Sequence, residues 1–268
     1  MPASASRSRD IERNRPARWR WPWVLLGVAV LLAGVAFALP ASVVGHFLPR
    51  QVHAEDWSGT AMHGAAGKLS VNARDAGAIE WQLHPLALLR GLVEMDIHWV
   101  KVGIVVDATT EIDRHGMTLR NIRGGGPIES LADFGVASGW RGNAAVNFEE
   151  LKIDFARPLS VVGKIEVTDI SAANIAAGAN LGSYLLQLPA GAVAADGSIS
   201  ANLKDTGGPI ELEAQIRISP TARTGFFSGA LKERPEAPAA LRAELQNLAQ
   251  LRPRDAQGRF PAELEFTF

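Results

Sequence analysis

The chain contains no cysteine among its 268 residues. This absence excludes thiol catalysis, a disulfide framework and any metal site built on cysteine ligands. A chain without thiols also suits an oxidising compartment, where stray thiols are a hazard. The location of the protein has to be inferred from other features of the sequence.

A strong charge of one sign is also missing, because the formal net charge is -1. No basic stripe with interleaved aromatic residues occurs, although nucleic-acid binding favours that pattern. We therefore predict no nucleic-acid partner. The length of the chain allows one or two domains, and all-β architectures of this size often form a single unit.

Motifs for metal binding are scarce. The six histidines form no H-x-x-x-H, H-E-x-x-H or H-x-H group. Two of them, His84 and His98, fall on the polar faces of predicted strands, which favours solvent exposure over metal ligation. We predict no metal site at any of the six, which are His46, His53, His63, His84, His98 and His115.

Motifs for catalysis are scarce as well. Gly124-Gly125-Gly126 precedes a possible helix, but no Lys-Ser/Thr follows it. We therefore predict a flexible loop there rather than a phosphate-binding loop. Ser58 and Ser228 both lack the G-x-S-x-G context of a nucleophile elbow.

Two acidic pairs have i, i+2 spacing on predicted strands: Glu94 with Asp96, and Glu211 with Glu213. This spacing could hold two carboxylates together, but a solvated strand face shows the same pattern, and we favour the solvated face. No nucleophile, base and orienting group come together. We predict that the protein is not an enzyme and has no catalytic or cofactor-binding residues and no cofactor.

One long uncharged run is present, over residues 21–44. It is long enough to cross a bilayer, which takes ~20 apolar residues. Residues 1–20 hold six arginines against two acidic residues, a local charge of +4. The positive-inside rule therefore predicts a cytoplasmic tail (1–20), a single transmembrane helix (21–44) and a β domain (45–268) in the periplasm or outside the cell.

A cleaved signal peptide is the main alternative for this run, because Ala36-Phe37-Ala38 resembles an A-x-A cleavage site. Its apolar core, residues 24–39, has 16 residues. That is slightly longer than the roughly 7–15 residues of a signal-peptide core, so we favour an uncleaved anchor. A buried helix of a soluble protein is the third alternative.

From residue 45 onward, apolar and polar residues alternate with a period of two, which is typical of strands. The clearest segment is 210–219. Similar alternation marks the segments 68–73, 79–84, 93–99, 151–155, 164–168, 198–204 and 264–268. One apolar and one polar face are typical of an antiparallel sheet that is covered on one side.

Turn signals separate these strands at 75–77, 114–116, 196–197 and 207–209. Short helices are predicted over 128–134 and 175–188, and an exposed loop over 233–240. With so little helix to cover its apolar face, the sheet is expected to curl into a half-barrel or to fold over as a partly open sandwich. The predicted fold class is mainly β: an N-terminal transmembrane helix, then a curved, largely antiparallel β-sheet with a few short helices.

The segment 84-HPLALLRG-91 joins two predicted strands without the Gly, Asn or Asp that a hairpin turn usually uses. We predict that Pro85 stops the first strand and that one short helical turn follows, ending at Gly91. Leu86 and Leu89 are expected to fold over the end of the apolar face and plug it. A surface for a membrane or a partner is the alternative.

Several landmarks follow one another in order along the chain. They are the N-terminal run into Leu39-Pro40-Ala41, then Trp57-Ser58-Gly59-Thr60 before Gly64 and Gly67, 81-WQLHPLALLRG-91, 130-SLAD-133, the stretch 142–151, 248-LAQL-251 and 254-RDAQGRFP-261. Together they resemble protein N of the type II (general) secretion pathway over nearly the whole chain. One departure is Ala54-Glu55-Asp56, where a Gly-Thr-Leu-Trp-like strand start is expected, and it leaves the register of the first strand open.

The resemblance implies an accessory inner-membrane component of a machine that exports folded periplasmic proteins through an outer-membrane channel. It also implies contact with other inner-membrane components, and with the outer-membrane secretin as a further partner. The family is distantly similar to AsmA-like proteins, whose curved sheets are associated with lipid handling. The alternative function is thus a groove that binds or conducts membrane lipid, lined by Val93, Met95, Ile97, Trp99, Ile210, Leu212, Ile216 and Ile218.

Overall fold

The computed structural model describes residues 38–134, 138–154, 157–251 and 254–267, together with positions 27 and 34. The predicted tail (1–20), the possible cleavage site and most of the predicted span (21–44) lie outside the described residues. Among the described residues, no helix is both long and apolar enough to cross a membrane. The last residues of the predicted span are described, and Ala41–Phe47 form the 3-10 helix η2.

The described chain forms one sheet of 13 strands whose order in space is their order in the sequence. Every neighbouring pair is antiparallel, as predicted. The strands are β1 (Val52–Gly59), β2 (His63–Val71), β3 (Arg74–Leu83), β4 (Val93–Lys101), β5 (Ile104–Ile112), β6 (Met117–Pro127), β7 (Trp140–Asp154), β8 (Arg157–Ala172), β9 (Asn180–Leu188), β10 (Ile199–Gly207), β11 (Ile210–Ser219), β12 (Thr224–Glu233) and β13 (Phe260–Thr267). The described helices after η2 are α2 (Pro85–Leu88), η3 (Ile128–Phe134), η4 (Ala176–Gly178) and α3 (Ala239–Leu251).

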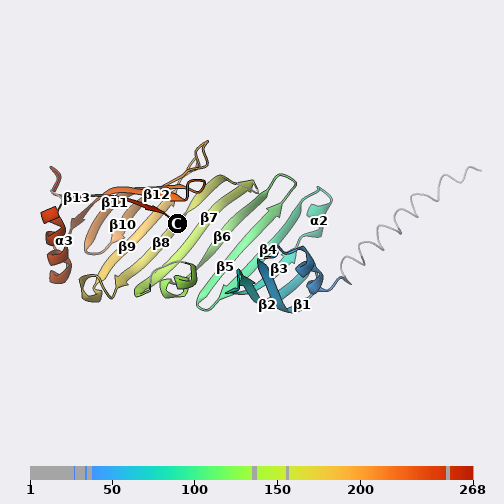
Figure 1. The fold of residues 1–268 in the computed structure, drawn as a ribbon. Coiled ribbons are helices and arrows are strands. Elements are labelled where there is room, and N and C mark those ends of the chain that lie inside the picture. The colour runs from blue at the N-terminus through green and yellow to red at the C-terminus, as the bar shows by residue number, and fades with distance from the viewer. Residues whose placement is uncertain are drawn as a thin grey trace, which may run out of the picture.

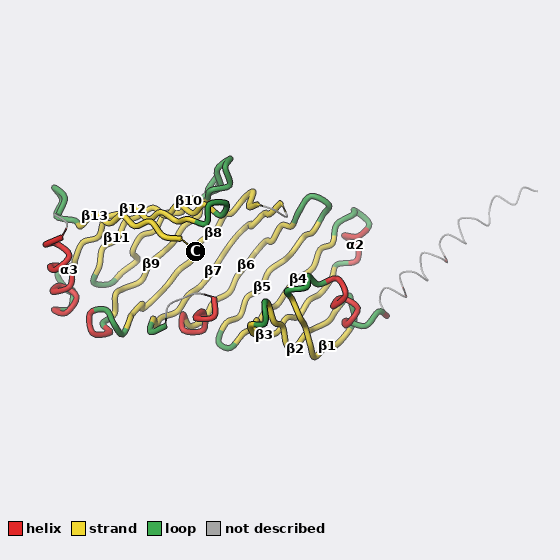
Figure 2. Tube along the Cα trace, in the orientation of Figure 1, coloured by secondary structure: helices red, strands yellow, loops and turns green. Residues whose placement is uncertain are grey.

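The sheet is long, twisted and curved, with β1–β3 toward one end and α3 at the other (Figure 1). It does not close, because β1 and β13 occupy opposite ends of the strand order. The helices lie at the ends and along the turns of the sheet rather than across its middle (Figure 2). The mainly β, antiparallel prediction is therefore confirmed, and the single unclosed sheet fits the half-barrel better than the folded-over sandwich.

The strand register aligns one row of small or apolar residues across all 13 strands, which we call the apolar row. Directly paired residues point to the same face, so this row marks one face of the whole sheet. The apolar row is Trp57, Ala66, Ile79, Trp99, Val106, Gly124, Val146, Ile165, Leu186, Leu203, Ala214, Gly229 and Ala262. It also answers the open question of register in β1, since Trp57 pairs with Ala66.

A second row runs beside the first on the opposite face, and we call it the polar row. It consists of Ser58, Ala65, Glu80, His98, Asp107, Arg123, Asn147, Lys164, Gln187, Asn202, Gln215, Ser228 and Glu263. Within the apolar row only Ala66 and Ala214 are buried, and the other members stay partly exposed. In the part of the chain that the structure describes, the sheet therefore separates polar from apolar side chains, and no second layer buries the apolar face.

Two clusters supply much of the buried core, and both lie against short elements that cover parts of the apolar face. In the first, Leu241 and Leu245 of α3 pack on Leu181 and Phe260. In the second, Ala192 of the loop after β9 packs with Val161, Leu188 and Ala201. Helix α3 was not expected from the sequence, where only a loop over 233–240 precedes it.

The predicted helix over 175–188 is wrong. Only the single turn η4 is helical there, and Asn180–Leu188 form strand β9. Leu181, Leu185 and Leu188 have the spacing of a helical stripe, but β8 and β10 flank this segment and supply backbone partners on both sides. Tertiary pairing thus overrides the local pattern.

Two further local predictions are wrong. The turn expected at 75–77 lies inside β3, and Asn72 and Ala73 make the turn instead, with φ angles of 51° and 63°. The flexible loop expected at Gly124–Gly126 lies inside β6. A Cβ at Gly124 would come within 2.3 Å of the Val105 carbonyl oxygen, and one at Gly126 within 2.2 Å of the Gly103 oxygen. These glycines therefore permit close strand approach.

Candidate functional site

The polar face of β3–β6 carries a set of interacting polar side chains. A shallow depression of about 370 Å³ opens on this face. Its polar lining comes from four neighbouring strands and from the start of β2, namely His63, Glu80, Gln82, Asp96, His98, Asp107, Thr109 and Asn121. Strand alternation brings these side chains together, because each sits at a polar position of its own strand.

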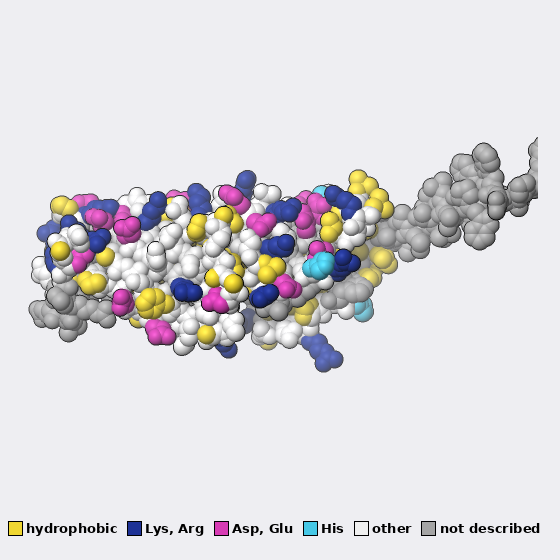
Figure 3. All heavy atoms as spheres, turned by 90° about the horizontal axis from the view of Figure 1, so that it is seen from above, with side chains coloured by type: hydrophobic (Ala, Val, Ile, Leu, Met, Phe, Trp, Pro, Cys, Tyr) yellow, Lys and Arg dark blue, Asp and Glu magenta, His cyan; other side chains and the backbone are white. Residues whose placement is uncertain are grey.

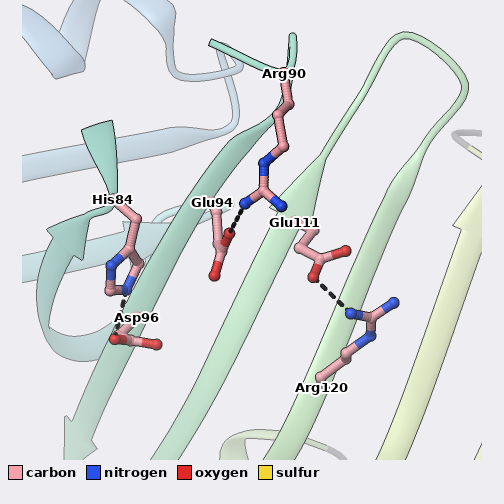
Figure 4. Close-up of polar contacts among 6 residues, drawn as sticks. All are labelled: His84, Arg90, Glu94, Asp96, Glu111 and Arg120. Atoms are coloured by element: carbon pink, nitrogen blue, oxygen red, sulfur yellow. Dashed lines mark hydrogen bonds and ion pairs between the residues drawn. The ribbon is translucent and has the colours of Figure 1, made fainter. Parts of the chain in front are cut away.

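Asp96 is the centre of one group. Its carboxylate lies 2.8 Å from Nε2 of His84, as Figure 4 shows. It also accepts a 2.8 Å hydrogen bond from the Thr109 hydroxyl. The Thr109 hydroxyl, followed by His84, holds the pKa of Asp96 below its ordinary value. Asp96 is therefore an ionised acceptor at neutral pH and not a proton donor.

A second histidine makes a parallel contact one strand further on. Nδ1 of His98 lies 2.6 Å from Oδ1 of Asp107, its register partner on β5. The predicted exposure of His84 and His98 on polar strand faces is confirmed, since their side chains are 41% and 42% exposed. Among the described residues, no three His, Asp or Glu side chains are grouped in a way that could hold a metal ion.

The acidic pair Glu94 and Asp96 does not share a partner, because each carboxylate contacts a different side chain (Figure 4). Glu94 faces Arg90 at 3.6 Å, whereas Asp96 faces His84. Glu111 is the register partner of Glu94 on β5, and it forms an ion pair with Arg120 at 2.6 Å. Each carboxylate has its own cationic or hydrogen-bonding neighbour, so the solvated strand face is the better description of this pair.

In the second acidic pair, each carboxylate likewise has its own cationic neighbour. Glu211 lies opposite Lys232, and Glu213 lies opposite Lys204. Ser58 and Ser228 stand within β1 and β12 on the polar row, and neither occupies the strand-to-helix turn of a nucleophile elbow. The described polar face thus offers alternating charges and amides for binding, rather than a nucleophile with its base.

The turn α2 has the predicted form but not the predicted role. Pro85 begins it and Gly91 follows it with a φ of 73°. Ala87 is the residue that packs inward, at 1% exposure, whereas Leu86 is 76% exposed and Leu89 84% exposed. The plug that the sequence suggested is therefore wrong, because both leucines are exposed instead of packing on the apolar face they were expected to close.

The last strand, β13, forms an edge of the sheet. It pairs with β12 on one side, and no further strand of the described chain pairs with its other side. Two apolar side chains stay exposed on it, Leu264 at 60% and Phe266 at 38%. An edge with free backbone groups and exposed apolar side chains can accept another strand.

The residues expected to line a lipid groove share the apolar face. On β4 and β11 they are all partly exposed, and none is buried: Val93, Met95, Ile97, Trp99, Ile210, Leu212, Ile216 and Ile218. The two strands lie in different parts of the strand order, separated by β5–β10. These residues therefore lie at two separate places along the apolar face of one continuous sheet.

One comparison with known proteins gives a match. The family model described as type II secretion system (T2SS), protein N matches residues 50–263. The match begins just before β1 and ends within β13, so it includes both edges of the sheet. Neither a curated protein nor a solved structure shows a significant match to the chain.

Proposed function

Because the chain belongs to the type II secretion system protein N family, we propose that it is an accessory, non-enzymatic component of that system at the bacterial inner membrane. Residues 21–44 anchor it, the tail 1–20 is cytoplasmic, and the sheet lies in the periplasm. The family match supports a part in type II secretion and protein transport. The uncharged run and the arginines before it support the anchor and its orientation.

The open edge at β13 is the observation that best supports a docking role. A periplasmic component can extend the sheet there by adding a strand, with Leu264 and Phe266 contributing apolar contacts. The partners that fit this role are inner-membrane components of the machinery and the outer-membrane secretin. A 13-stranded sheet gives the anchor a long, rigid arm that carries this edge away from β1.

Deletion of the gene with its neighbours left intact tests the function. We expect secreted hydrolases to accumulate in the periplasm, and the full-length gene supplied in trans should restore export. Normal export from the deletion strain would contradict the proposed function.

Photocrosslinking in living cells tests the docking edge. A photoreactive residue at Glu265, exposed on β13, should form adducts with secretion components. The matched control is Gln215, which is also exposed but lies on β11 inside the sheet. Equal adducts from both positions, or none from Glu265, would argue against docking at the edge.

A lipid-handling surface is the second candidate, because the apolar row is continuous and most of it is partly exposed. A photoreactive residue at Ile165 should then yield phospholipid adducts that mass spectrometry detects. Lys164 is the control, since it is the neighbouring residue on the opposite face of β8. Adducts from neither position, or equally from both, would count against this candidate.

A further inference from the structure

Three leucines stand exposed at the end of the β3–β4 hairpin, and we call them the leucine tip. Leu86 is 76% exposed, Leu88 43% and Leu89 84%. Figure 3 shows hydrophobic side chains at the surface of the end of the molecule that carries α2. Leaving three large apolar side chains in water within four residues is unfavourable, so a contact outside the described chain should cover them.

The leucine tip is held rigidly. Ala87 is buried, and its carbonyl accepts hydrogen bonds from Arg90 N at 2.9 Å and Leu92 N at 3.2 Å. At the base of the turn, His84 N donates to Glu94 O at 2.8 Å. These bonds fix the turn between β3 and β4, so the leucines cannot fold back onto the sheet without breaking it.

The tip lies at the same end of the strands as the point where the chain arrives from its long apolar run. Ala61 N donates to Leu39 O at 2.8 Å, and the next residue, Met62, accepts from Leu83 N at 2.7 Å. Leu39 ends the apolar core of residues 24–39, and Leu83 ends β3 just before α2. Two consecutive residues, Ala61 and Met62, thus tie the end of this apolar core to the strand that leads into the tip.

We propose that the leucine tip inserts into the outer surface of the lipid bilayer that the apolar core of the anchor, residues 24–39, crosses. This inference depends on the proposed function only because both require the same membrane anchor. An anchor that enters the bilayer at Leu39 brings the lipid surface to the end of the strands at which the tip lies. The contact orients the sheet relative to the membrane and gives the anchor a second point of attachment.

The chemistry of the tip fits a bilayer better than a protein partner. A stable protein interface buries about 800 Å² on each partner, which is more than one four-residue turn can supply. Shallow insertion into lipid needs only a few apolar side chains beside polar or cationic ones. Arg90, with a side chain 68% exposed, follows Leu89 directly and can stay at the depth of the phosphates while the leucines reach below them.

The absence of cysteine allows a direct test on the full chain. Single variants Leu89→Cys and Leu86→Cys are labelled with an environment-sensitive fluorophore and reconstituted in vesicles of phosphatidylethanolamine and phosphatidylglycerol. Val102→Cys is the matched control. Val102 is 85% exposed, close to the 84% of Leu89, but it lies in the β4–β5 turn at the opposite end of β4. Trypsin resistance equal to that of the unmodified chain confirms that each variant folds.

We expect blue-shifted emission at positions 86 and 89, with severalfold stronger quenching by acyl-chain nitroxide lipids than at position 102. Equal, water-like emission at positions 89 and 102 overturns the proposal. A label at 89 that is shielded from iodide but not quenched by nitroxide lipid also overturns it, and indicates contact with protein instead. If the chain does not float with the vesicles, both the anchor and the membrane contact of the tip are overturned. Normal secretion after gene deletion contradicts only the proposed function and leaves the proposal for the tip standing.

Discussion

Trp57 and Trp81 meet edge to face, with ring centroids 6.0 Å apart and ring planes inclined at 76°. They stand on β1 and β3, so the contact passes over β2, where Gly64 leaves room for it. The Trp81 indole N–H donates to Ala61 O at 3.0 Å, and a Cβ on Gly45 of η2 would meet the Trp57 ring at 2.9 Å. This pair joins η2 to the first three strands next to the point where Leu39 enters the domain.

Gly64→Ala should therefore destabilise the domain. A Cβ at residue 64 would lie 2.5 Å from Thr60 O and 2.6 Å from the Trp81 ring. Overpacking of this kind costs about 1–3 kcal/mol in free energy of unfolding. Gly67→Ala on the same strand is the control. A Cβ there would come no closer than 3.2 Å to another atom, Asp56 Cβ, so we expect little change in the free energy of unfolding. Urea unfolding measures both, and equal costs would show that the tryptophan pair does not determine the need for glycine.

Ala87→Asp and Leu89→Asp should differ sharply, although they lie two residues apart. Ala87 is buried, so an unpaired carboxylate there should cost about 3 kcal/mol or more. Leu89 is exposed, and its substitution should change the free energy of unfolding by no more than about 0.5 kcal/mol. Thermal unfolding of the two variants gives the comparison. A large loss at Leu89 would restore the idea that the leucine plugs the sheet.

Thr110→Val should stabilise the protein. Thr110 is 2% exposed on the apolar face between Met95 and Leu119, and its hydroxyl has no hydrogen-bond partner among the described residues. Replacing the hydroxyl with a methyl group of similar shape should add about 1 kcal/mol.

Thr109→Val, one residue earlier on the polar face, is the control for Thr110. It removes the hydroxyl that donates to Asp96, so the pKa of Asp96 should rise toward its ordinary value. A lowered pKa in the folded state gives stability that is present above the ordinary value and is lost as the pH falls through the folded one. Thr109→Val should therefore weaken only this acid-sensitive contribution, which carboxylate NMR and unfolding at two pH values can measure.

Tyr184 should titrate late. Burial, followed by the nearby charge of Asp205, raises its pKa to about 12, and its hydroxyl donates to Leu181 O at 2.7 Å. Since it is the single tyrosine of the chain, the tyrosinate absorbance reports on it alone.

The raised pKa has a consequence for stability. The contribution of the neutral phenol is fully present below about pH 10, the ordinary tyrosine value, and is lost as the pH rises through the folded value. Tyr184→Phe should lack this loss. A titration midpoint near the ordinary value would show that the phenol is open to water.

The strands were predictable wherever one face is apolar and the other polar. Residues 210–219 were expected as a strand from strict alternation, and β11 has those bounds. The segment 175–188 was not predictable in this way, because Leu181, Leu185 and Leu188 fit a helical stripe whereas Tyr184, Leu186 and Leu188 fit a strand. Only the neighbours β8 and β10 decide between the two. Gly124–Gly126 was assigned to a loop, since nothing local shows that the carbonyls of β5 and β7 would approach so closely.

The amino-acid sequence was enough to predict the mainly β, antiparallel class, the polar positions of His84 and His98, the helical turn after Pro85 and the resemblance to the secretion family. These follow from local periodicity and from residues that restrict the backbone. It took the three-dimensional arrangement of the strands to show that the sheet stays open, that α3 covers one end of it, and that Leu86, Leu88 and Leu89 are exposed. Those outcomes depend on which strands become neighbours and which surfaces remain without one, and no pattern within a single strand contains that information.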